Sequence, residues 1–417
     1  MNTRTPSGAA VALALAGSMI AGTAHAADCA MEDVNARVNV LGNEFPAIQA
    51  VMAAARECAH DGLTVTGNLT TEHKDIQVAA LTANPSEYTG AFVANSSLVP
   101  LVNADLIRPL DDLVEQYGEN ISDRQKIVID GKIMAIAFMA NAQHLMFRED
   151  MLEEAGVEPP TTYEEVLSAA EAIKEAGIVE HPLTGTFGAG WNLGEEFINM
   201  YLGHGGDLFK GGTAEPNLDT PEAVATLEKM KALTELMNPD YLTFDTNAAQ
   251  TEFEQGRAAI MNMWGSRAGA VIDDQGTVEG VSENTVFAAA PTVAEGSVPA
   301  TTLWWDGLVI PRNVSDEDAA ATFRAVTHGM TAEVANANAD AAVWLIDGYE
   351  PTGTDAGVMA SVEAGARPYP MLPYVGLMHT ALGDELVEFL QGTESAEKAL
   401  ADAAASYTTA AREGGYL

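Results

Sequence analysis

Basic residues are scarce in this sequence of 417 residues. There are 20 lysines and arginines against 60 aspartates and glutamates, which gives a formal net charge of −40 at pH 7. A surface this acidic repels nucleic acid and anionic membranes, so we expect neither as a partner. The acidic residues are spread along the chain rather than gathered in a tail, which is typical of solvated protein surfaces.

The sequence also lacks the motifs of several enzyme classes. It has no GxSxG turn of a serine hydrolase, no HExxH zinc site and no phosphate-binding loop, and its 8 histidines are scattered. We therefore expect a protein without catalytic residues, metal or cofactor. A periplasmic glycosidase stays open as the enzyme alternative, because two carboxylates suffice for that chemistry and acidic residues are abundant here.

Cysteine is nearly absent. The sequence contains only Cys29 and Cys58, and neither belongs to a CxxC motif, so zinc binding and thioredoxin-like chemistry are not indicated. An exported protein meets an oxidising compartment, and we therefore predict a disulfide between these two residues. The alternative is two free, buried thiols.

The N-terminus has the pattern of a secretory signal. Arg4 precedes an apolar run over residues 9–21, and Ala24 and Ala26 are the small residues that a signal peptidase recognises. The apolar run is too short to span a bilayer comfortably. We expect cleavage after Ala26, which makes residues 1–26 a signal peptide and places the mature protein in the periplasm.

Strand and helix patterns alternate along the rest of the chain. Residues 37–41 alternate like a strand, the apolar positions of residues 45–55 recur at helical spacing, and residues 63–66 are typical of a second strand. This order predicts an open α/β sheet. Ligands of such sheets bind at the loops that follow the strands, and Glu44 lies in the first of these loops.

Five motifs together resemble the family 1 extracellular solute-binding proteins. They are DGKIMAIA from Asp130, LMFREDMLEEAGVEPPTT from Leu145, FEQGRAAIM from Phe253, WDGLVIP from Trp305 and RPYP from Arg367. They occur in the family's order and span nearly all of the chain that follows the signal.

The resemblance implies a two-lobe periplasmic-binding-protein fold, in which each lobe is a sheet flanked by helices and several hinge crossings join the lobes. We expect the first lobe to hold residues 27–140 and 291–329, and the second to hold residues 141–290 and 330–417. The resemblance further implies a monomer that captures a small sugar, or a related polyol or oligosaccharide, in the cleft. It would deliver this solute to the permease subunits of an ABC importer.

Sugar binding requires planar polar groups beside aromatic faces. We expect the cleft to be lined by Glu44, Asn95, Asn141, Trp191, Trp264, Arg267, Trp305, Asp306 and Arg367. Each has a structural alternative: the tryptophans could belong to the core, Glu44 could stabilise a helix N-terminus, Asp306 could cap a turn, and Arg367 could form a surface ion pair.

Two features of this set concern the contacts with the ligand. Adjacent residues on a strand point to opposite faces, so only one of Trp304 and Trp305 should contact the ligand, and we expect Trp305. Asn95 and Asn141 occupy positions where many sugar-binding relatives carry carboxylates. Together with a site formed by Lys74, Arg267 and Arg367, these amides leave open a receptor for an anionic or nitrogenous solute.

Overall fold

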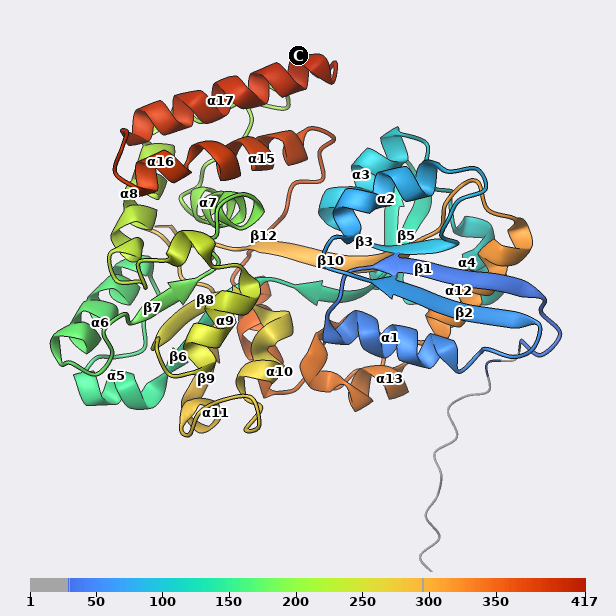
Figure 1. The fold of residues 1–417 in the computed structure, drawn as a ribbon, viewed down its shortest axis with the longest axis horizontal. Coiled ribbons are helices and arrows are strands. Elements are labelled where there is room, and N and C mark those ends of the chain that lie inside the picture. Colours follow the sequence, from blue (N-terminus) through green and yellow to red (C-terminus); the bar gives the residue numbers. More distant parts are fainter. Residues whose placement is uncertain (1–28, 30, 295) are drawn as a thin grey trace, which may run out of the picture.

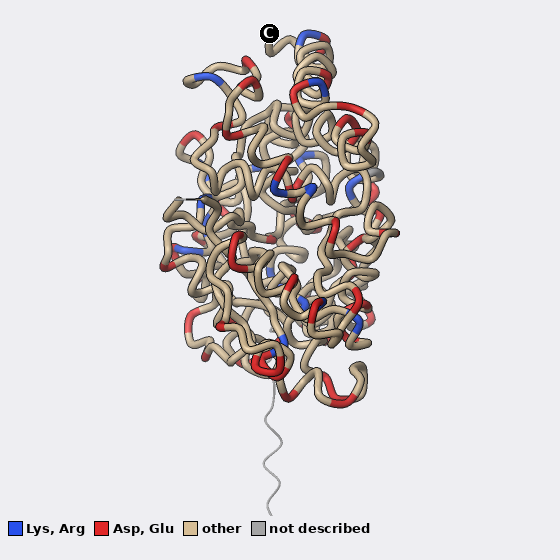
Figure 2. Tube along the Cα trace, turned by 90° about the vertical axis from the view of Figure 1, so that its left-hand side faces the viewer, with Lys and Arg blue, Asp and Glu red and all other residues tan. Residues whose placement is uncertain are grey.

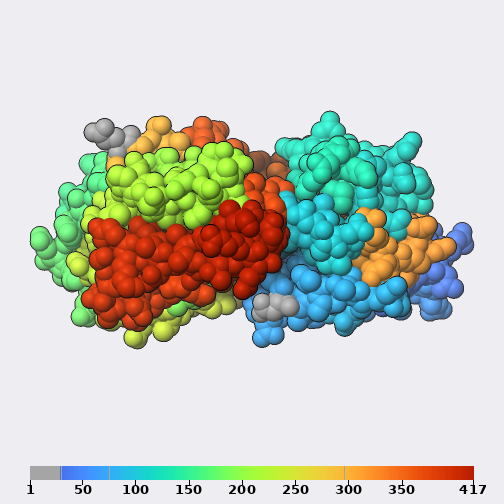
Figure 3. Space-filling model, turned by 90° about the horizontal axis from the view of Figure 1, so that it is seen from above, coloured from blue at the N-terminus to red at the C-terminus, as the bar shows by residue number. Residues whose placement is uncertain are grey.

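The computed structural model describes residue 29 and residues 31–294 and 296–417 (Figure 1). The expected signal peptide lies outside this part of the chain. Two bodies lie side by side: one is formed mainly by the N-terminal part of the chain, the other mainly by its middle and its C-terminal helices (Figure 3). Each contains its own sheet. Within the described residues, no helix is both long enough and apolar enough to cross a bilayer.

The first lobe contains a mixed sheet of eight strands in the order β11-β5-β10-β3-β1-β2, with β4 paired to β5 and β12 paired to β10. Its strands are β1 (Ala36–Gly42), β2 (Leu63–Leu69), β3 (Gly90–Ala94), β4 (Lys126–Ile129), β5 (Lys132–Asn141), β10 (Thr302–Val309), β11 (Val343–Trp344) and β12 (Arg367–Pro368). β1 pairs in parallel with both β2 and β3, whereas β10 is antiparallel to β3 and β5. The carboxyl ends of β1, β2 and β3 therefore lie at one edge.

Helices cover both faces of this sheet (Figure 1). They are α1 (Pro46–Arg56), α2 (His73–Thr82), α3 (Asn95–Asn103), α4 (Asp111–Tyr117), α12 (Asp316–His328) and α13 (Ala332–Ala337). On one face, Ile48 of α1 and Phe323 of α12 belong to a buried cluster with β1. On the other face, Leu81 of α2 and Leu98 of α3 belong to a second cluster. The sheet is thus enclosed by apolar helix faces on both sides.

The second lobe contains a smaller sheet in the order β7-β8-β6-β9. Its strands are β6 (Gln143–Arg148), β7 (Leu183–Gly185), β8 (Ile260–Trp264) and β9 (Thr285–Ala288). Its helices are α5 (Glu149–Ala155), α6 (Tyr163–Glu175), α7 (Trp191–Gly203), α8 (Pro221–Thr234), α9 (Thr246–Glu254), α10 (Ala268–Val271), α11 (Val281–Asn284), α14 (Ala356–Glu363), α15 (Val375–Glu385), α16 (Val387–Leu390) and α17 (Ala396–Glu413). The two-lobe α/β architecture predicted from the sequence is confirmed.

Local sequence accounts for where several of these helices begin. The Thr162 side chain accepts a hydrogen bond from the Glu165 backbone N–H at 3.1 Å, and the Glu165 carboxylate bonds back to Thr162, so α6 starts with a capping box. α7 starts after Gly190, whose φ of 91° favours glycine. Every residue of α7 from Leu193 to Gly203 is buried, which makes it the central helix of the second lobe.

Within residues 31–294 and 296–417, the chain crosses between the lobes at three places. The first crossing is Ala142, between β5 and β6, next to Asn141, where a crossing was expected. The second lies within β10, because Trp304 packs in the second-lobe core while Leu308 packs in the first. The expected boundary near residue 291 is therefore too early. The third follows Ile346, after β11 has joined the first-lobe sheet.

Residues 332–346 pack in the first lobe, although we expected the chain to have returned to the second lobe from residue 330. Ala335, Trp344 and Ile346 are buried in the first-lobe core beside α1. This short apolar segment fits either core by composition, and only its pairing with β5 assigns it.

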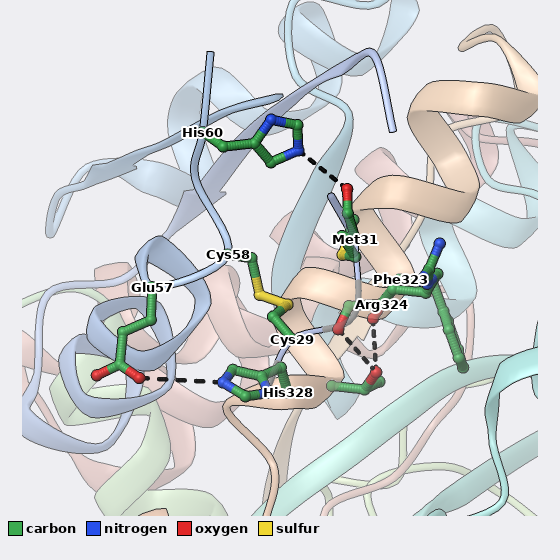
Figure 4. Close-up of a disulfide and its surroundings, with 9 residues drawn as sticks. Cys29, Met31, Glu57, Cys58, His60, Phe323, Arg324 and His328 are labelled. Atoms are coloured by element: carbon green, nitrogen blue, oxygen red, sulfur yellow. Dashed lines mark hydrogen bonds and ion pairs between the residues drawn. A yellow bond between two sulfur atoms is a disulfide. The ribbon is translucent and has the colours of Figure 1, made fainter. Parts of the chain in front are cut away.

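Cys29 and Cys58 are joined by a disulfide (Figure 4). The bond ties the segment before β1 to the residues that follow α1. Next to it, His60 Nε2 lies 2.9 Å from the Met31 carbonyl oxygen, a second link between the same two segments. The N-terminal segment is therefore anchored to the first lobe.

Acidic residues lie all around the molecule, and basic residues are few (Figure 2). Most ion pairs are at the surface; one example is Arg108 with Asp316, whose side chains are 29% and 86% exposed. Exposed pairs contribute only about 0–1 kcal/mol each, so they do not hold the fold together.

Candidate ligand-binding site

A cavity of about 450 Å³ lies between the two lobes. From the first lobe it is lined by Asn43, Glu44, Phe45, Thr71, His73, Lys74, Ala94 and Asp306. From the second lobe and the crossings it is lined by Asn141, Trp191, Asn192, Asp245, Thr246, Asn247, Trp264, Ser266, Arg267 and Trp304. This size is within the usual range for small-molecule sites, roughly 300–1,000 Å³.

The first-lobe wall is made by the carboxyl ends of parallel strands. Asn43 and Glu44 follow β1, and Ala94 is the last residue of β3. Lys74 lies in the first turn of α2, which follows β2. The wall is therefore where an open α/β sheet normally presents its ligand contacts.

The second-lobe wall is aromatic. The Trp191 ring stacks against Trp264 with centroids 6.4 Å apart, and Trp304 meets the two rings edge-on at 5.6 and 5.9 Å. Trp191 is 39% exposed, whereas Trp304 is 6% exposed. Trp191 therefore offers the largest open aromatic surface of the three, and Trp304 fills the back of the wall.

A buried carboxyl fixes the Trp304 ring. Trp304 Nε1 and the Thr302 hydroxyl donate to Glu195 Oε1 at 3.0 and 2.8 Å. Burial raises the pKa of Glu195 to about 8, while these hydrogen bonds act in the opposite direction. Its neighbour Glu196 accepts from Gln143 Nε2 at 2.8 Å, and burial raises its pKa to about 7. Two adjacent carboxyls of α7 are thus buried in the second lobe, and Glu195 is the one that contacts Trp304.

A buried histidine supports Trp191 from inside the second lobe. The His379 ring stacks on Trp191 with centroids 4.7 Å apart. His379 Nε2 lies 2.7 Å from the Trp191 carbonyl, which can only accept, so Nε2 carries the proton. Nδ1 then accepts from the Tyr369 hydroxyl at 2.8 Å. Burial lowers the pKa of His379 to about 3, so the ring is neutral.

Charged groups of both signs face the cavity. Burial raises the pKa of Asp306 to about 7, and the nearby Lys74 opposes that rise. Burial lowers the pKa of Arg267, while Asp245 and Glu254 act in the opposite direction. The cavity therefore combines an aromatic wall with both donors and acceptors, and has no single dominant charge.

The chain also matches the sequence model of a known family, described as bacterial extracellular solute-binding protein, over residues 45–325. This match covers more than half of the chain and both walls of the cavity. The chain belongs to this family.

Solved structures agree on the fold of this solute-binding protein. It is similar to maltose-bound MalE3 of T. maritima, with a TM-score of 0.78 and 18% identity, covering 90% of this chain and 99% of that one. It is similar to a solute-binding protein of Agrobacterium radiobacter K84 in complex with ribitol, with a TM-score of 0.77, 19% identity, and coverage of 90% and 99%. It is also similar to a chitin oligosaccharide binding protein, with a TM-score of 0.76 and 17% identity, covering 90% of this chain and 98% of that one.

The structure brings most of the predicted site residues of this solute-binding protein to one cavity. Those that line it are Glu44, Asn141, Trp191, Trp264, Arg267 and Asp306. Asn141 also links the first crossing to the second-lobe wall, because its Nδ2 donates to the Ser266 hydroxyl at 3.1 Å and its Oδ1 accepts from the Ser266 N–H at 3.2 Å.

Trp305 points away from the cavity. Trp304 lines the cavity instead, although we expected Trp305 to do so. Alternate side chains of a strand share a face, so Trp304 and Asp306 lie together on the cavity side of β10. Trp305 packs instead against the first-lobe cluster that includes Leu98. Trp305 and Asp306 are adjacent and could not both face the ligand. The alternation itself was predicted correctly, and the chosen face was wrong.

Asn95 and Arg367 do not line the cavity either. Asn95 is 2% exposed, and its Nδ2 donates to the Leu303 carbonyl at 3.1 Å, which holds α3 against β10. Arg367 forms an ion pair with Asp207 at 2.5 Å and donates to the Gly206 carbonyl at 3.0 Å. For Arg367 the structural alternative, a surface ion pair, describes what the structure shows.

Sequence reasoning missed several residues of the site. Asp245 has the sequence pattern of a helix N-cap, and its carboxylate accepts a hydrogen bond from the Ala248 N–H at 2.8 Å. This structural role gives no signal that Asp245 also lines the cavity. Glu195 and His379 lie in segments with no recognisable motif. Two adjacent glutamates in a largely apolar helix were the available signal for Glu195, since such groups need partners when they are buried.

Proposed function

We propose that this protein is the receptor of an ABC import system and binds a small neutral carbohydrate or polyol between its lobes. The observation that carries the proposal is the wall of Trp191, Trp264 and Trp304 facing hydrogen-bonding groups across a cavity of about 450 Å³. Sugars present apolar C–H faces and arrays of hydroxyls, and they need both kinds of surface.

The related structures support this class of ligand. Their printed descriptions name maltose, ribitol and chitin oligosaccharide as what those proteins bind. The two-lobe design supports a receptor role, because closure around a solute changes the shape that membrane partners contact. The proposal includes a monomer that works in the periplasm with the permease subunits of its importer and catalyses no reaction.

The test is a thermal-shift screen of the mature protein against neutral sugars, polyols, organic anions and amino acids, followed by calorimetry. A ligand that binds only the folded state raises the melting temperature. Stabilisation by neutral sugars or polyols alone is the expected result. Small-angle scattering of the protein with the identified solute should show a smaller radius of gyration, and size-exclusion chromatography should give a monomer.

An anionic or nitrogenous solute is the second candidate, and Lys74 and Arg267 favour it because both line the cavity. The carboxylates of Glu44, Asp245 and Asp306 share that lining and offset the two cations. Stabilisation by organic anions but not by sugars would select this candidate. Release of a reducing sugar from a glycoside by the purified protein would instead show a glycosidase.

A further inference from the structure

Lys74 makes a contact across the cleft that binding of a neutral solute does not by itself require. Its Nζ lies 4.4 Å from the centroid of the Trp191 ring. Lys74 belongs to α2 of the first lobe and Trp191 begins α7 of the second lobe, and both line the cavity. An ammonium over an indole face is a cation–π contact, and here it joins the two lobes.

The ammonium lies at the open part of the aromatic wall. His379 stacks on Trp191 and is only 2% exposed, so it supports the ring from the lobe interior. Trp304 is 6% exposed. Trp191 therefore has the aromatic surface that a solute in the cavity would use first, and a positive charge already lies on it.

The surroundings are those of a cation site. Asp306, Glu44 and Asp245 line the same cavity. The charge of Lys74 lowers the pKa values of Asp306 and Glu195, against the larger effect of burial. Aromatic faces combined with carboxylates are the surface that recognises organic ammonium ions. Without Lys74, the cleft would present that surface with Arg267 as the cation left in its lining.

We propose that Lys74 is a specificity-determining residue: its ammonium fills the cation position of the cleft, so that neutral solutes are admitted and solutes carrying an organic ammonium group are excluded. The inference rests on the proposed function, because it assumes that the cleft between the lobes is where the solute binds. Exclusion follows from like-charge repulsion at the Trp191 face, which a solute with an ammonium group meets and a neutral solute does not.

Lys74→Met removes the charge and keeps a side chain of similar length. The test titrates tetramethylammonium chloride into the variant and the wild type, following tryptophan fluorescence and calorimetry, with sodium chloride at equal concentration as the blank. The pH is kept well above 7, because the pKa of Asp306 is about 7 with Lys74 present and rises when that charge is removed. The affinity of the variant for tetramethylammonium should exceed that of the wild type by roughly tenfold, the size of one desolvated cation–π contact.

Two controls sharpen the test. Lys132→Met removes an exposed lysine outside the cavity lining and should behave as the wild type. Lys74→Arg keeps a cation and should still exclude tetramethylammonium, whereas Lys74→Gln should admit it. Melting curves verify that each variant is folded, which we expect because Lys74 is exposed.

Equal affinity of the wild type and Lys74→Met for tetramethylammonium, or no binding by either, would overturn the inference. This result is independent of the carbohydrate screen. If no neutral solute binds the wild type but Lys74→Met gains tetramethylammonium binding, the proposed ligand class fails while the role of Lys74 stands. If sugars bind the wild type and Lys74→Met gains no tetramethylammonium binding, the proposed ligand class stands and the role of Lys74 fails.

Discussion

The first-lobe wall of the cleft includes exposed polar side chains that follow strand ends, whereas the second-lobe wall includes tryptophans held by buried polar groups. Glu44 and Lys74 are exposed and belong to short local segments after β1 and β2. Trp304 is fixed by Glu195, more than one hundred residues away in the chain. Substitutions of exposed residues in the first-lobe wall should therefore have little effect on stability, whereas substitution of a residue such as Trp304 in the second-lobe wall disturbs the core of that lobe.

This contrast predicts that two residues of the aromatic wall differ in their roles: mutation of buried Trp304 should mainly reduce stability, and mutation of exposed Trp191 should mainly reduce binding. Trp304→Ala should lower the free energy of unfolding by roughly 3–5 kcal/mol, because it leaves a cavity in the core and removes a donor from buried Glu195. Urea denaturation measures the loss. Trp305→Ala is the matched control: it should lower stability as well but leave ligand affinity per folded molecule unchanged. A loss of affinity in Trp305→Ala alone would reverse our assignment of the two rings.

Trp191→Ala should act on binding more than on stability. Its ring is 39% exposed and lies in the cavity wall, so truncation removes aromatic surface from the cavity together with the partner of Lys74. We expect affinity to fall by about tenfold to a hundredfold, which corresponds to about 1–3 kcal/mol. Calorimetry of the variant with the identified solute provides the measurement. Unchanged affinity would transfer the stacking role to Trp264.

The buried carboxyls should make the second lobe sensitive to pH. Burial raises the pKa of Glu195 from its usual 4.5 to about 8. Between these values the folded protein keeps a proton that the unfolded chain releases, so stability falls as pH rises to about 8 and then levels off. The contribution of one group is at most about 1.4 kcal/mol per pH unit. Glu195→Gln should therefore flatten the decline.

Urea midpoints over a pH series measure this slope. Glu44→Gln is the matched control on the other wall, and its profile should follow that of the wild type because this carboxylate is exposed. A Glu195→Gln profile as steep as that of the wild type would mean that the buried carboxyl does not hold its proton.

Arg367→Ala should have the smallest effect. Its partner Asp207 is 64% exposed and Arg367 itself 40%, so the ion pair contributes about 0–1 kcal/mol. Affinity should be unchanged, because Arg367 does not line the cavity. A tenfold loss of affinity would show that the cleft extends beyond the cavity seen here.

Motifs and periodicity predicted the fold class, the family and six of the residues that line the cavity. Glu44 was located by a local rule, since a loop after a parallel strand lies at the ligand-binding edge. Trp191 and Trp264 were located by composition, because tryptophan is rare here and both lie beside residues typical of loops. The errors concern residues whose side-chain direction depends on a partner. Trp305 was chosen over Trp304 from the resemblance to the family, because no local rule says which face of β10 meets the second lobe.

The sequence by itself determined the alternation of strands and helices, the acidic surface and the family, because these follow from residue types read a few positions at a time. Tertiary structure alone decided which side of β10 faces the cleft, where the chain crosses between lobes, and which polar groups fix the tryptophans. The physical reason is that these features depend on contacts between residues far apart in the chain. Glu195 meets Trp304 and Lys74 meets Trp191 only after the lobes have formed.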